Sequence, residues 1–388
     1  MNINGLIHLL KNDKKCNFVA MAITPHQMIG VEAVIRYLTE HGKKLYGYIL
    51  VTNHPDTGGS LDKANLKYHS DNIKYLNFSY SFPQKDNRVT NNIKVKFDMF
   101  KTIFCNIKKT GAFYFVWTEV VNNIVYAINK AQNDRKIIFI KIDDGAASYQ
   151  PPFEYRLSYL LVHSKNIYEV TKAYIKAYLF SITTFLFENC LRKQKAFIDA
   201  TLFWRVVNNG KMHFVKNKMF TQYYRDAFVR ENANFNGKGF ENAVVVNSQC
   251  FVESGITDGK VDYDIYSQLA KVLSDMGEKV IIKPHPREKN VARYRELGWE
   301  IYEDNHFSQE EILANLTVKP KAIIGFYSST LLNAVGLFNI QVISLANIAL
   351  QENISPVFRK ELVSFKRNYN HCILFPKNWN QLCEMLVK

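Results

Sequence analysis

Apolar and polar residues alternate along the first third of the chain in a pattern typical of an α/β protein. Short apolar runs at residues 17–23, 45–51, 112–117 and 136–142 predict strands. The run at 136–142 consists almost entirely of β-branched and other apolar residues, which is typical of a strand buried on both faces of a parallel sheet. Between the runs, apolar residues at helical spacing predict helices, one of them at residues 120–131.

The first of these helices has a well-marked start. Thr24 is a favoured N-cap, Pro25 suits the first helical position because it has no amide hydrogen to satisfy, and Gln27 follows three residues after the cap. The helix is predicted to end near Gly42. Its apolar face carries Met28, Val31, Val34, Ile35 and Leu38.

The same alternation restarts after a polar, glycine-containing break at residues 231–239. The second block predicts strands at 243–246, 279–282, 322–326 and 341–344, and helices at 263–276 and 328–338. Two blocks of βαβ alternation predict two doubly wound, Rossmann-like domains facing a central cleft. We place the first domain at residues 1–237 and the second at residues 238–388.

A long apolar and aromatic stretch at residues 167–187 lies between the two blocks. It carries Glu169, Lys172 and Lys176, which a membrane-spanning helix would have to bury. The stretch is therefore predicted to be a core helix or an interfacial one.

The formal net charge of +15 indicates an affinity for polyanions. Residues 156–218 hold eleven Lys and Arg against three acids. An acidic glycan or anionic lipid headgroups fit this charge, and a merely solvated basic surface is an equal alternative. Nucleic acid is not predicted as a partner, because neither zinc-finger spacing nor an aromatic RNA-binding signature accompanies the charge.

The cysteines favour a reducing compartment. All six are far apart and form no CxxC pair, which argues against both a disulfide framework and a zinc site. The apolar run near the N-terminus is too short for a signal peptide, and its charges follow the run. We expect a cytoplasmic protein, with peripheral attachment to the inner membrane as an open alternative.

The first candidate for chemistry is Asp143-Asp144-Gly145, directly after the buried strand at 136–142. Ligands of open α/β sheets bind at the carboxyl ends of strands. Adjacent carboxylates diverge, so one can face the cleft as a general base while the other anchors the loop. A solvated turn is the competing interpretation, since this sequence is common in loops.

A second candidate follows the strand at 279–282. His285 stands between Pro284 and Pro286, which stiffen its backbone, and Lys283 and Arg287 flank it with positive charge suited to a phosphate. The alternative is a turn histidine beside an exposed basic cluster.

The third candidate is the start of the helix at 328–338, where Ser328, Ser329 and Thr330 follow a strand. Free N–H groups and the helix dipole bind phosphate at such a helix start. The competing interpretation is a serine that acts only as the N-cap. Ser308 and Glu311 have capping-box spacing, so a structural role for Glu311 is at least as well supported as a ligand role.

Together these motifs predict an inverting sugar transfer from an activated nucleotide sugar. A carboxylate base on the first domain would face an imidazole and a hydroxyl-rich helix start on the second, with the leaving phosphate on the second domain. No cluster of residues has metal-ligand spacing, so no metal is predicted to hold that phosphate.

The three motifs, in this order, resemble those of bacterial sialyltransferases of the lipooligosaccharide type (glycosyltransferase family 52-like) and of the related capsule polysialyltransferases. The helix start at Thr24-Pro25-His26-Gln27 is also similar to the first βα turn of the lipooligosaccharide type. The resemblance covers most of the chain, but residues 150–242 match nothing that we can align.

The resemblance implies a GT-B fold, an acceptor domain followed by a CMP-sialic acid domain, inversion, and no metal or other cofactor. It implies Asp144 as general base, Asp143 as loop support and His285 at the CMP phosphate. The loop at 247–253 holds the base in some members. Here it has no Asp, and Glu253 is the alternative base.

The remaining roles implied by the resemblance concern binding. Ser328, Ser329 and Thr330 would hold the phosphate, and Glu311 or Glu310 the ribose. The other predicted donor residues are Lys283, Pro284, Pro286 and Gln249, and the predicted acceptor residues are His26, Gln27 and Gly145.

The predicted reaction is transfer of sialic acid from CMP-sialic acid to a terminal galactoside of a bacterial surface glycan (lipooligosaccharide, O-antigen or capsule), with α-2,3 linkage. Asp143-Asp144, where the capsule polymerases have Glu-Glu, favours single addition. The alternatives are a polysialyltransferase that extends an α-2,8 or α-2,9 chain, an enzyme with a different nucleotide-sugar donor, and a non-catalytic polyanion-binding protein.

Overall fold

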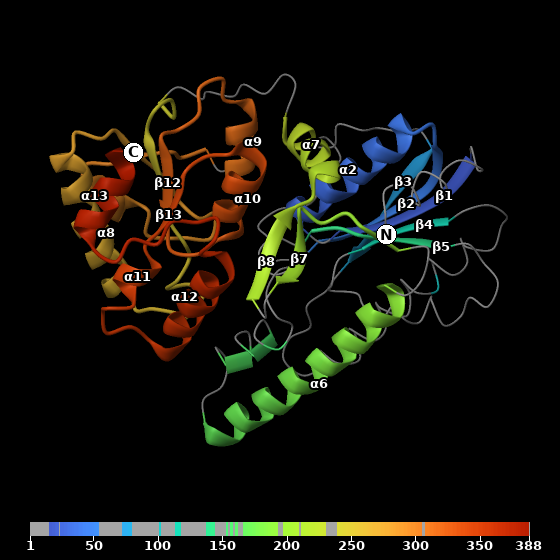
Figure 1. Cartoon of the computed structure of the whole chain (residues 1–388), viewed down its shortest axis with the longest axis horizontal. Helices are drawn as coiled ribbons and strands as arrows, with labels where there is room; N and C mark the ends of the chain where they lie inside the picture. Colours follow the sequence, from blue (N-terminus) through green and yellow to red (C-terminus); the bar gives the residue numbers. More distant parts are fainter. Residues whose placement is uncertain are drawn as a thin grey trace. The chain divides into compact units, whose positions relative to one another are not determined.

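The computed structural model describes residues 15–22, 24–53, 72–79, 101, 113–117, 137–143, 153, 156–157, 160–161, 166–192, 197–208, 211–229, 239–304 and 307–387. The chain divides into two compact units (Figure 1). The first comprises Met1–Asp144, Ile182–Leu202 and Asn217–Ala227, and the second comprises Gly145–Ser181, Phe203–Lys216 and Phe228–Lys388. The sequence boundary between residues 237 and 238 stays a prediction.

The first unit contains a six-stranded parallel sheet in the order β3-β2-β1-β4-β5-β6. Its strands are β1 (Lys15–Ala22), β2 (Lys44–Asn53), β3 (Ile73–Ser79), β4 (Phe113–Trp117), β5 (Ile137–Lys141) and β6 (Phe197–Asp199). The strands predicted at 17–23, 45–51, 112–117 and 136–142 are thereby confirmed. The strand order reverses between β1 and β4, which makes their carboxyl ends the switch point of a doubly wound sheet.

The helix predicted after the first strand is α2 (Pro25–Glu40), and it starts as the sequence indicates. Thr24 is the N-cap, and its Oγ1 accepts a hydrogen bond of 3.2 Å from the Gln27 amide. The predicted apolar face is buried throughout: Met28, Val31, Val34, Ile35 and Leu38 are each at most 3% exposed. The helix predicted at 120–131 lies outside the described residues.

A second helix of this unit, α7 (Lys218–Phe228), packs against α2 (Figure 1). The rings of Tyr37 and Phe220 lie 5.0 Å apart between their centroids. At Gly30 the two helices come so close that a Cβ would lie 2.8 Å from the Tyr224 hydroxyl oxygen. The glycine therefore permits a contact that places Tyr224 near the end of β5.

The second unit contains a five-stranded parallel sheet in the order β11-β10-β9-β12-β13. Its strands are β9 (Val244–Asn247), β10 (Val280–Lys283), β11 (Glu300–Ile301), β12 (Ala322–Gly325) and β13 (Val342–Ser344). All four strands predicted for the second block are present. The switch point lies at the carboxyl ends of β9 and β12.

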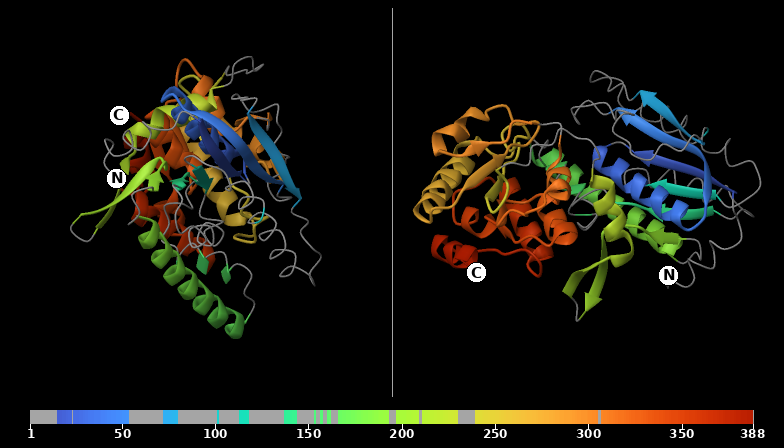
Figure 2. Two further views of the ribbon diagram at one scale, coloured as in Figure 1. Left: turned by 90° about the vertical axis from the view of Figure 1, so that its right-hand side faces the viewer. Right: turned by 90° about the horizontal axis from the view of Figure 1, so that it is seen from above.

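Helices cover both faces of this sheet (Figure 2). Val244, Val246 and Ile324 belong to one apolar cluster with residues of α8, α11, α12 and α13. The alternate strand residues Val245 and Ile323 are buried outside that cluster, on the face that α10 contacts. The helices are α8 (Lys260–Asp275), α9 (Gln309–Asn315), α10 (Ser329–Phe338), α11 (Ala346–Ala349), α12 (Pro356–Tyr369) and α13 (Trp379–Val387). Burial on both faces explains the continuous apolar runs in the sequence.

The middle segment contains elements that the hydrophobic pattern did not separate. β7 (Phe203–Asn208) and β8 (Lys211–Lys216) form an antiparallel hairpin. The apolar stretch at 167–187 is the helix α6 (Ile167–Arg192), which buries Ala173 and Ala177 against Leu157. Within the described part of the chain, no helix has both the length and the apolarity needed to cross a bilayer.

Candidate active site

The predicted donor motifs of the second unit lie at one edge of its sheet, at the carboxyl ends of β9, β10 and β12. The loop after β9 contacts both of its neighbours. Ser248 Oγ accepts a hydrogen bond of 3.1 Å from the His285 amide, and the Gln249 side-chain amide donates to the Tyr327 carbonyl. The structure therefore brings His285 and the start of α10 to the same edge, as the sequence predicts.

The imidazole of His285 has a defined tautomer. The Arg287 amide donates a hydrogen bond of 3.1 Å to Nδ1, so the ring hydrogen must be on Nε2. Nε2 lies 3.9 Å from the Cys250 Sγ. Burial lowers the pKa of His285 to about 4, aided by the positive charges of Arg287 and Lys283 and opposed by Glu253. At neutral pH, His285 is an uncharged donor through Nε2–H.

Two cationic side chains accompany this donor. The Arg287 guanidinium Nη2 lies 3.3 Å from the Cys250 Sγ. The ammonium of Lys283 lies 5.3 Å from the centroid of the Tyr302 ring, and the residue is only 7% exposed. Burial lowers the pKa of Lys283, although the charges of nearby acids oppose this shift. A neutral imidazole donor with positive charge around it suits a bound phosphate.

The start of α10 is capped by Ser328. Its Oγ accepts a hydrogen bond of 3.1 Å from the Thr330 amide. N-capping, one of the two interpretations of this motif, is therefore present. A serine hydroxyl that accepts one bond keeps its own hydrogen to donate, so capping leaves phosphate binding possible. Ser329 and Thr330 are half-buried in the first turn, and their contact with phosphate stays a prediction.

Both predicted ribose carboxylates have structural contacts. Glu311 forms a complete capping box with Ser308, with a bond of 2.7 Å from the Ser308 amide to Oε2 and one of 3.2 Å from its own amide to the Ser308 Oγ. Glu310 accepts a hydrogen bond of 2.8 Å from the Asn333 side chain. The structural role of Glu311 is therefore observed, and ribose binding stays a prediction for both.

The alternative base, Glu253, is bonded to the segment that follows His285. Its Oε1 accepts a hydrogen bond of 2.8 Å from the Lys289 amide. Burial by itself would raise the pKa of Glu253, but this bond and the charges of Arg293 and Lys289 lower the pKa below its usual value. A carboxylate with a lowered pKa is a weaker base.

In the first unit, Asp143 stands at the carboxyl end of β5 with its side chain fully buried. Its Oδ2 accepts a hydrogen bond of 3.1 Å from the Leu202 amide, and its own amide donates to the Tyr224 hydroxyl at 3.1 Å. Burial, followed by the negative charge of Asp143, raises the pKa of Tyr224 well above its usual value. This is the geometry of an anchoring carboxylate.

The remaining predicted residues of the first domain are those assigned to the base and to the acceptor. Asp144 and Gly145 lie outside the described residues. His26 is half-buried and Gln27 is buried, both in the first turn of α2. The meeting of Asp144 and His285 across a cleft stays a prediction.

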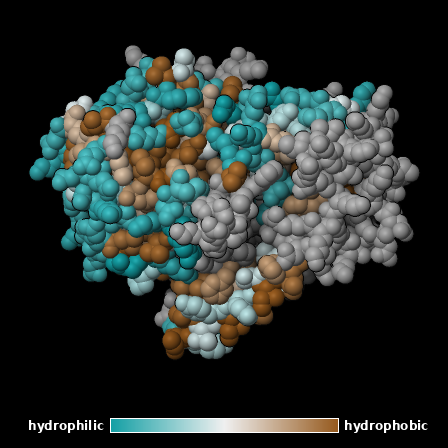
Figure 3. Space-filling view, viewed as in Figure 1, coloured by the Kyte–Doolittle hydropathy of each residue, from teal (hydrophilic) through white to brown (hydrophobic). Residues whose placement is uncertain are grey.

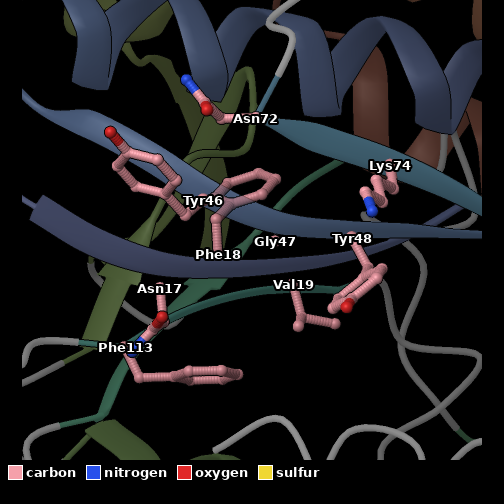
Figure 4. A pocket seen from close by; sticks show the side chains of 9 residues that line it. All are labelled: Asn17, Phe18, Val19, Tyr46, Gly47, Tyr48, Asn72, Lys74 and Phe113. Carbon is pink, nitrogen blue, oxygen red and sulfur yellow. The ribbon is translucent and has the colours of Figure 1, made fainter. Parts of the chain in front are cut away.

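A hollow of about 270 Å³ in the first unit lies away from these motifs (Figure 4). It is lined by side chains from the amino-terminal halves of β1, β2 and β4 and from the start of β3: Asn17, Phe18, Val19, Tyr46, Gly47, Tyr48, Asn72, Lys74 and Phe113. Asp143 is at the opposite, carboxyl end of the strands, so this hollow is not the predicted site.

Ser248, Cys250 and Glu288 surround His285 but were not among the predicted site residues. Ser248 and Cys250 are in the loop after β9, and Glu288 follows His285 by three residues. Their sequence signal is weak, because single polar residues after a strand are common in any protein. A serine at the end of a central strand was the one usable hint.

Solved structures with a similar arrangement have low sequence identity to this chain. One is a putative UDP-N-acetylglucosamine 2-epimerase from Listeria monocytogenes, with a TM-score of 0.53, 9% identity, and coverage of 96% of this chain and 88% of that one. A UDP-GlcNAc 2-epimerase from Methanocaldococcus jannaschii has a TM-score of 0.44, 14% identity, and coverage of 96% and 92%. The Listeria structure supports the fold, and the predicted GT-B class is confirmed.

A family model described as alpha-2,8-polysialyltransferase matches residues 20–347, a range that includes Asp143, His285 and Ser328. The comparison with curated proteins finds no match. The predicted resemblance to bacterial sialyltransferases is confirmed at the level of this family, and the lipooligosaccharide type stays a prediction. The chain is a glycosyltransferase that belongs to the alpha-2,8-polysialyltransferase family.

Proposed function

We propose that this protein transfers sialic acid from CMP-sialic acid to a sugar hydroxyl, with inversion and without a metal ion. The observation that carries the proposal is the geometry of His285: an uncharged Nε2–H donor at the carboxyl edge of the sheet, near Arg287 and Lys283. This arrangement suits an anionic leaving group. Metal independence and inversion are what the family resemblance implies.

In the proposed reaction, the bond between the anomeric carbon and the CMP phosphate oxygen breaks, and its electron pair stays on the phosphate. His285 Nε2–H donates a hydrogen bond to that oxygen as its charge grows. Asp144 takes the proton of the acceptor hydroxyl, whose oxygen forms the new bond to the anomeric carbon. Asp143, anchored to the Leu202 amide, would support the loop that carries Asp144.

Two kinds of acceptor fit the proposed reaction. The family name favours extension of an α-2,8-linked chain. The Asp143-Asp144 pair favours a single addition to a terminal galactoside with α-2,3 linkage. A lipooligosaccharide, O-antigen or capsule glycan would supply either acceptor.

Release of CMP from CMP-sialic acid tests the proposed reaction directly. We expect release that depends on an acceptor and persists in EDTA, measured with a fluorescent lactoside and with its sialylated form. Single addition gives one new product on the lactoside, whereas polymerisation gives a ladder on the sialylated acceptor. UDP-sugars serve as control donors. Acceptor-independent release only, or transfer from a UDP-sugar instead, would contradict the proposal.

We also infer peripheral attachment to the cytoplasmic face of an anionic membrane through α6. This helix exposes apolar and aromatic side chains along most of its described length (Figure 3). The exposed residues include Ile167, Tyr168, Ile175, Tyr178, Leu179, Phe185 and Leu186, each at least 57% exposed. Lys172 and Lys176 are exposed on the same helix. Exposed apolar side chains with Tyr and Lys among them are typical of a helix that lies in a bilayer interface.

The double substitution Ile175→Ser with Leu179→Ser is expected to weaken binding to anionic vesicles about tenfold, because it removes apolar area that would be buried in lipid. Co-sedimentation with phosphatidylcholine vesicles, with and without phosphatidylglycerol, measures this binding. Val363→Ser is the matched control, since Val363 is exposed on α12. Equal vesicle binding by the unsubstituted protein, the double variant and Val363→Ser would rule out α6 as the membrane contact. A shift from dimer to monomer in the double variant would instead assign the exposed face of α6 to contact with a second copy of the protein.

A further inference from the structure

The loop that carries His285 is tied to a chain of buried polar side chains to which the proposed reaction gives no role. Ser248 is the link. Its hydroxyl accepts the hydrogen bond from the His285 amide at 3.1 Å and donates its own hydrogen to the Glu288 carboxylate. Ser248 is 4% exposed, so water does not readily replace either partner.

Glu288 connects Ser248 to a buried arginine. Its Oε1 accepts hydrogen bonds of 2.9 Å from Arg293 Nη2 and 2.5 Å from the Tyr294 hydroxyl. The same Nη2 of Arg293 lies 2.9 Å from Asp262 Oδ2, and Asp262 Oδ1 accepts a bond of 2.9 Å from Thr257. The series of hydrogen bonds therefore runs from the loop before α8, through Arg293, to the amide of His285.

Stability alone does not require such a chain. Two carboxylates and one guanidinium are shielded from solvent. The side chains of Asp262 and Glu288 are 0% and 3% exposed, and that of Arg293 is 12% exposed. Buried ion pairs contribute little net stability compared with apolar residues of the same size. A role in fixing one arrangement of neighbouring segments is the better-attested use of such groups.

These hydrogen-bonded side chains hold the amide N–H of His285. It is the only amide N–H in the Pro284-His285-Pro286 tripeptide, because a proline nitrogen carries no hydrogen. The Ser248 hydroxyl donates its hydrogen to Glu288, so a lone pair of its oxygen accepts the hydrogen bond from the His285 amide. The Arg287 amide then donates to Nδ1, which leaves the ring hydrogen on Nε2, 3.9 Å from the Cys250 Sγ. Position and tautomer of the ring are thus set by separate contacts.

We propose that Ser248, Glu288 and Arg293 are positioning residues for His285, which rests on the proposed function of that imidazole as a donor to the leaving phosphate. They touch neither phosphate nor sugar in this reaction. They set where the ring stands, and a displacement of about 1 Å at a reacting group can cost about 100-fold in rate.

The test compares Ser248→Ala and Glu288→Gln with the rescue variant Ser248→Thr, which keeps the hydroxyl. Glu296→Gln is the matched control, because this exposed carboxylate accepts a hydrogen bond from Tyr263 and is not bonded to Ser248, Glu288 or Arg293. Ser248→Ala and Glu288→Gln are expected to lower kcat about 10- to 100-fold with KM for CMP-sialic acid within threefold. Ser248→Thr is expected to recover most of kcat, and Glu296→Gln to retain it.

A second measurement separates this proposal from the function on which it rests. The ring resonances of His285, followed by NMR through a pH titration, should shift in Ser248→Ala and Glu288→Gln and stay unchanged in Glu296→Gln, whether or not the protein transfers sialic acid. Unchanged resonances and kcat, with only a lower melting temperature, would overturn the positioning role. Should Ser248→Ala fail to fold, the isosteric Glu288→Gln carries the same comparison.

Discussion

Replacing His285 with alanine is expected to lower kcat for sialyl transfer by about 100- to 1,000-fold, the usual cost of removing one donor to a developing anion. Ser248 holds the backbone amide of His285, which alanine retains, and the ring accepts a bond from the Arg287 amide without belonging to the main apolar cluster, so the fold should persist. The measurement is steady-state CMP release, with circular dichroism to check the fold. His371→Ala, at an exposed histidine of the same unit, is the control.

The pH dependence of this donor follows from the direction of its pKa shift. Burial lowers the pKa of His285 to about 4, so the free enzyme keeps the Nε2–H neutral donor throughout the neutral range. The rate should therefore show no loss centred near pH 6.5 that belongs to His285. Because the folded pKa lies below the unfolded one, the unfolded state binds the proton first as pH falls. The resulting loss of stability runs from about pH 6.5 down to about pH 4.

Full kcat in the His285→Ala variant would refute the role of His285 as the donor to the leaving phosphate.

The two adjacent aspartates are expected to respond oppositely to alanine substitution. Asp144→Ala should reduce transfer by on the order of 10²–10⁴-fold, the contribution of a general base, with little change in the melting temperature. Asp143→Ala should instead destabilise the fold by about 1–3 kcal/mol, because it leaves the buried Leu202 amide without its acceptor. Thermal unfolding and CMP release, measured on both variants, give the comparison.

Asn substitutions provide the matched controls for this pair. Asp143→Asn retains an oxygen that can accept from Leu202 and should recover part of the lost stability. Asp144→Asn keeps the size of the side chain but cannot take a proton, so it should stay inactive. Transfer by Asp144→Ala at the unsubstituted rate would eliminate it as the base and direct attention to Glu253.

Much of the fold follows from short-range patterns. The strands at the centre of both sheets are buried on both faces, so their apolar runs are continuous and easily located, as at β5 and β9. The start of α2 was predictable because Thr24 and Pro25 act locally, within one turn of helix. The edge strands β3, β6 and β11 were not predicted, because exposed or partly exposed residues are mixed into them. The edge strand β13 is buried along its length and was predicted.

The residues of the candidate site that could be predicted are likewise those marked by short-range patterns in the sequence. His285 and Ser328 could be predicted because prolines, hydroxyls and strand ends leave marks within a few residues of each other. Glu311 could be assigned to a capping box from spacing alone, and the structure confirms both of its bonds.

The sequence by itself determined the α/β class, the two blocks of strands, and which segments end in polar residues suited to chemistry, since each depends on neighbours in the chain. Only the tertiary structure decided that Asp143 anchors to Leu202, that Nδ1 of His285 accepts a bond so that Nε2 carries the hydrogen, and that Ser248, Glu288 and Arg293 join in one buried chain. Ser248 and Glu288 are forty residues apart, as are many other polar pairs. Sheet order and loop packing select the one pair that meets, and that selection leaves no local trace.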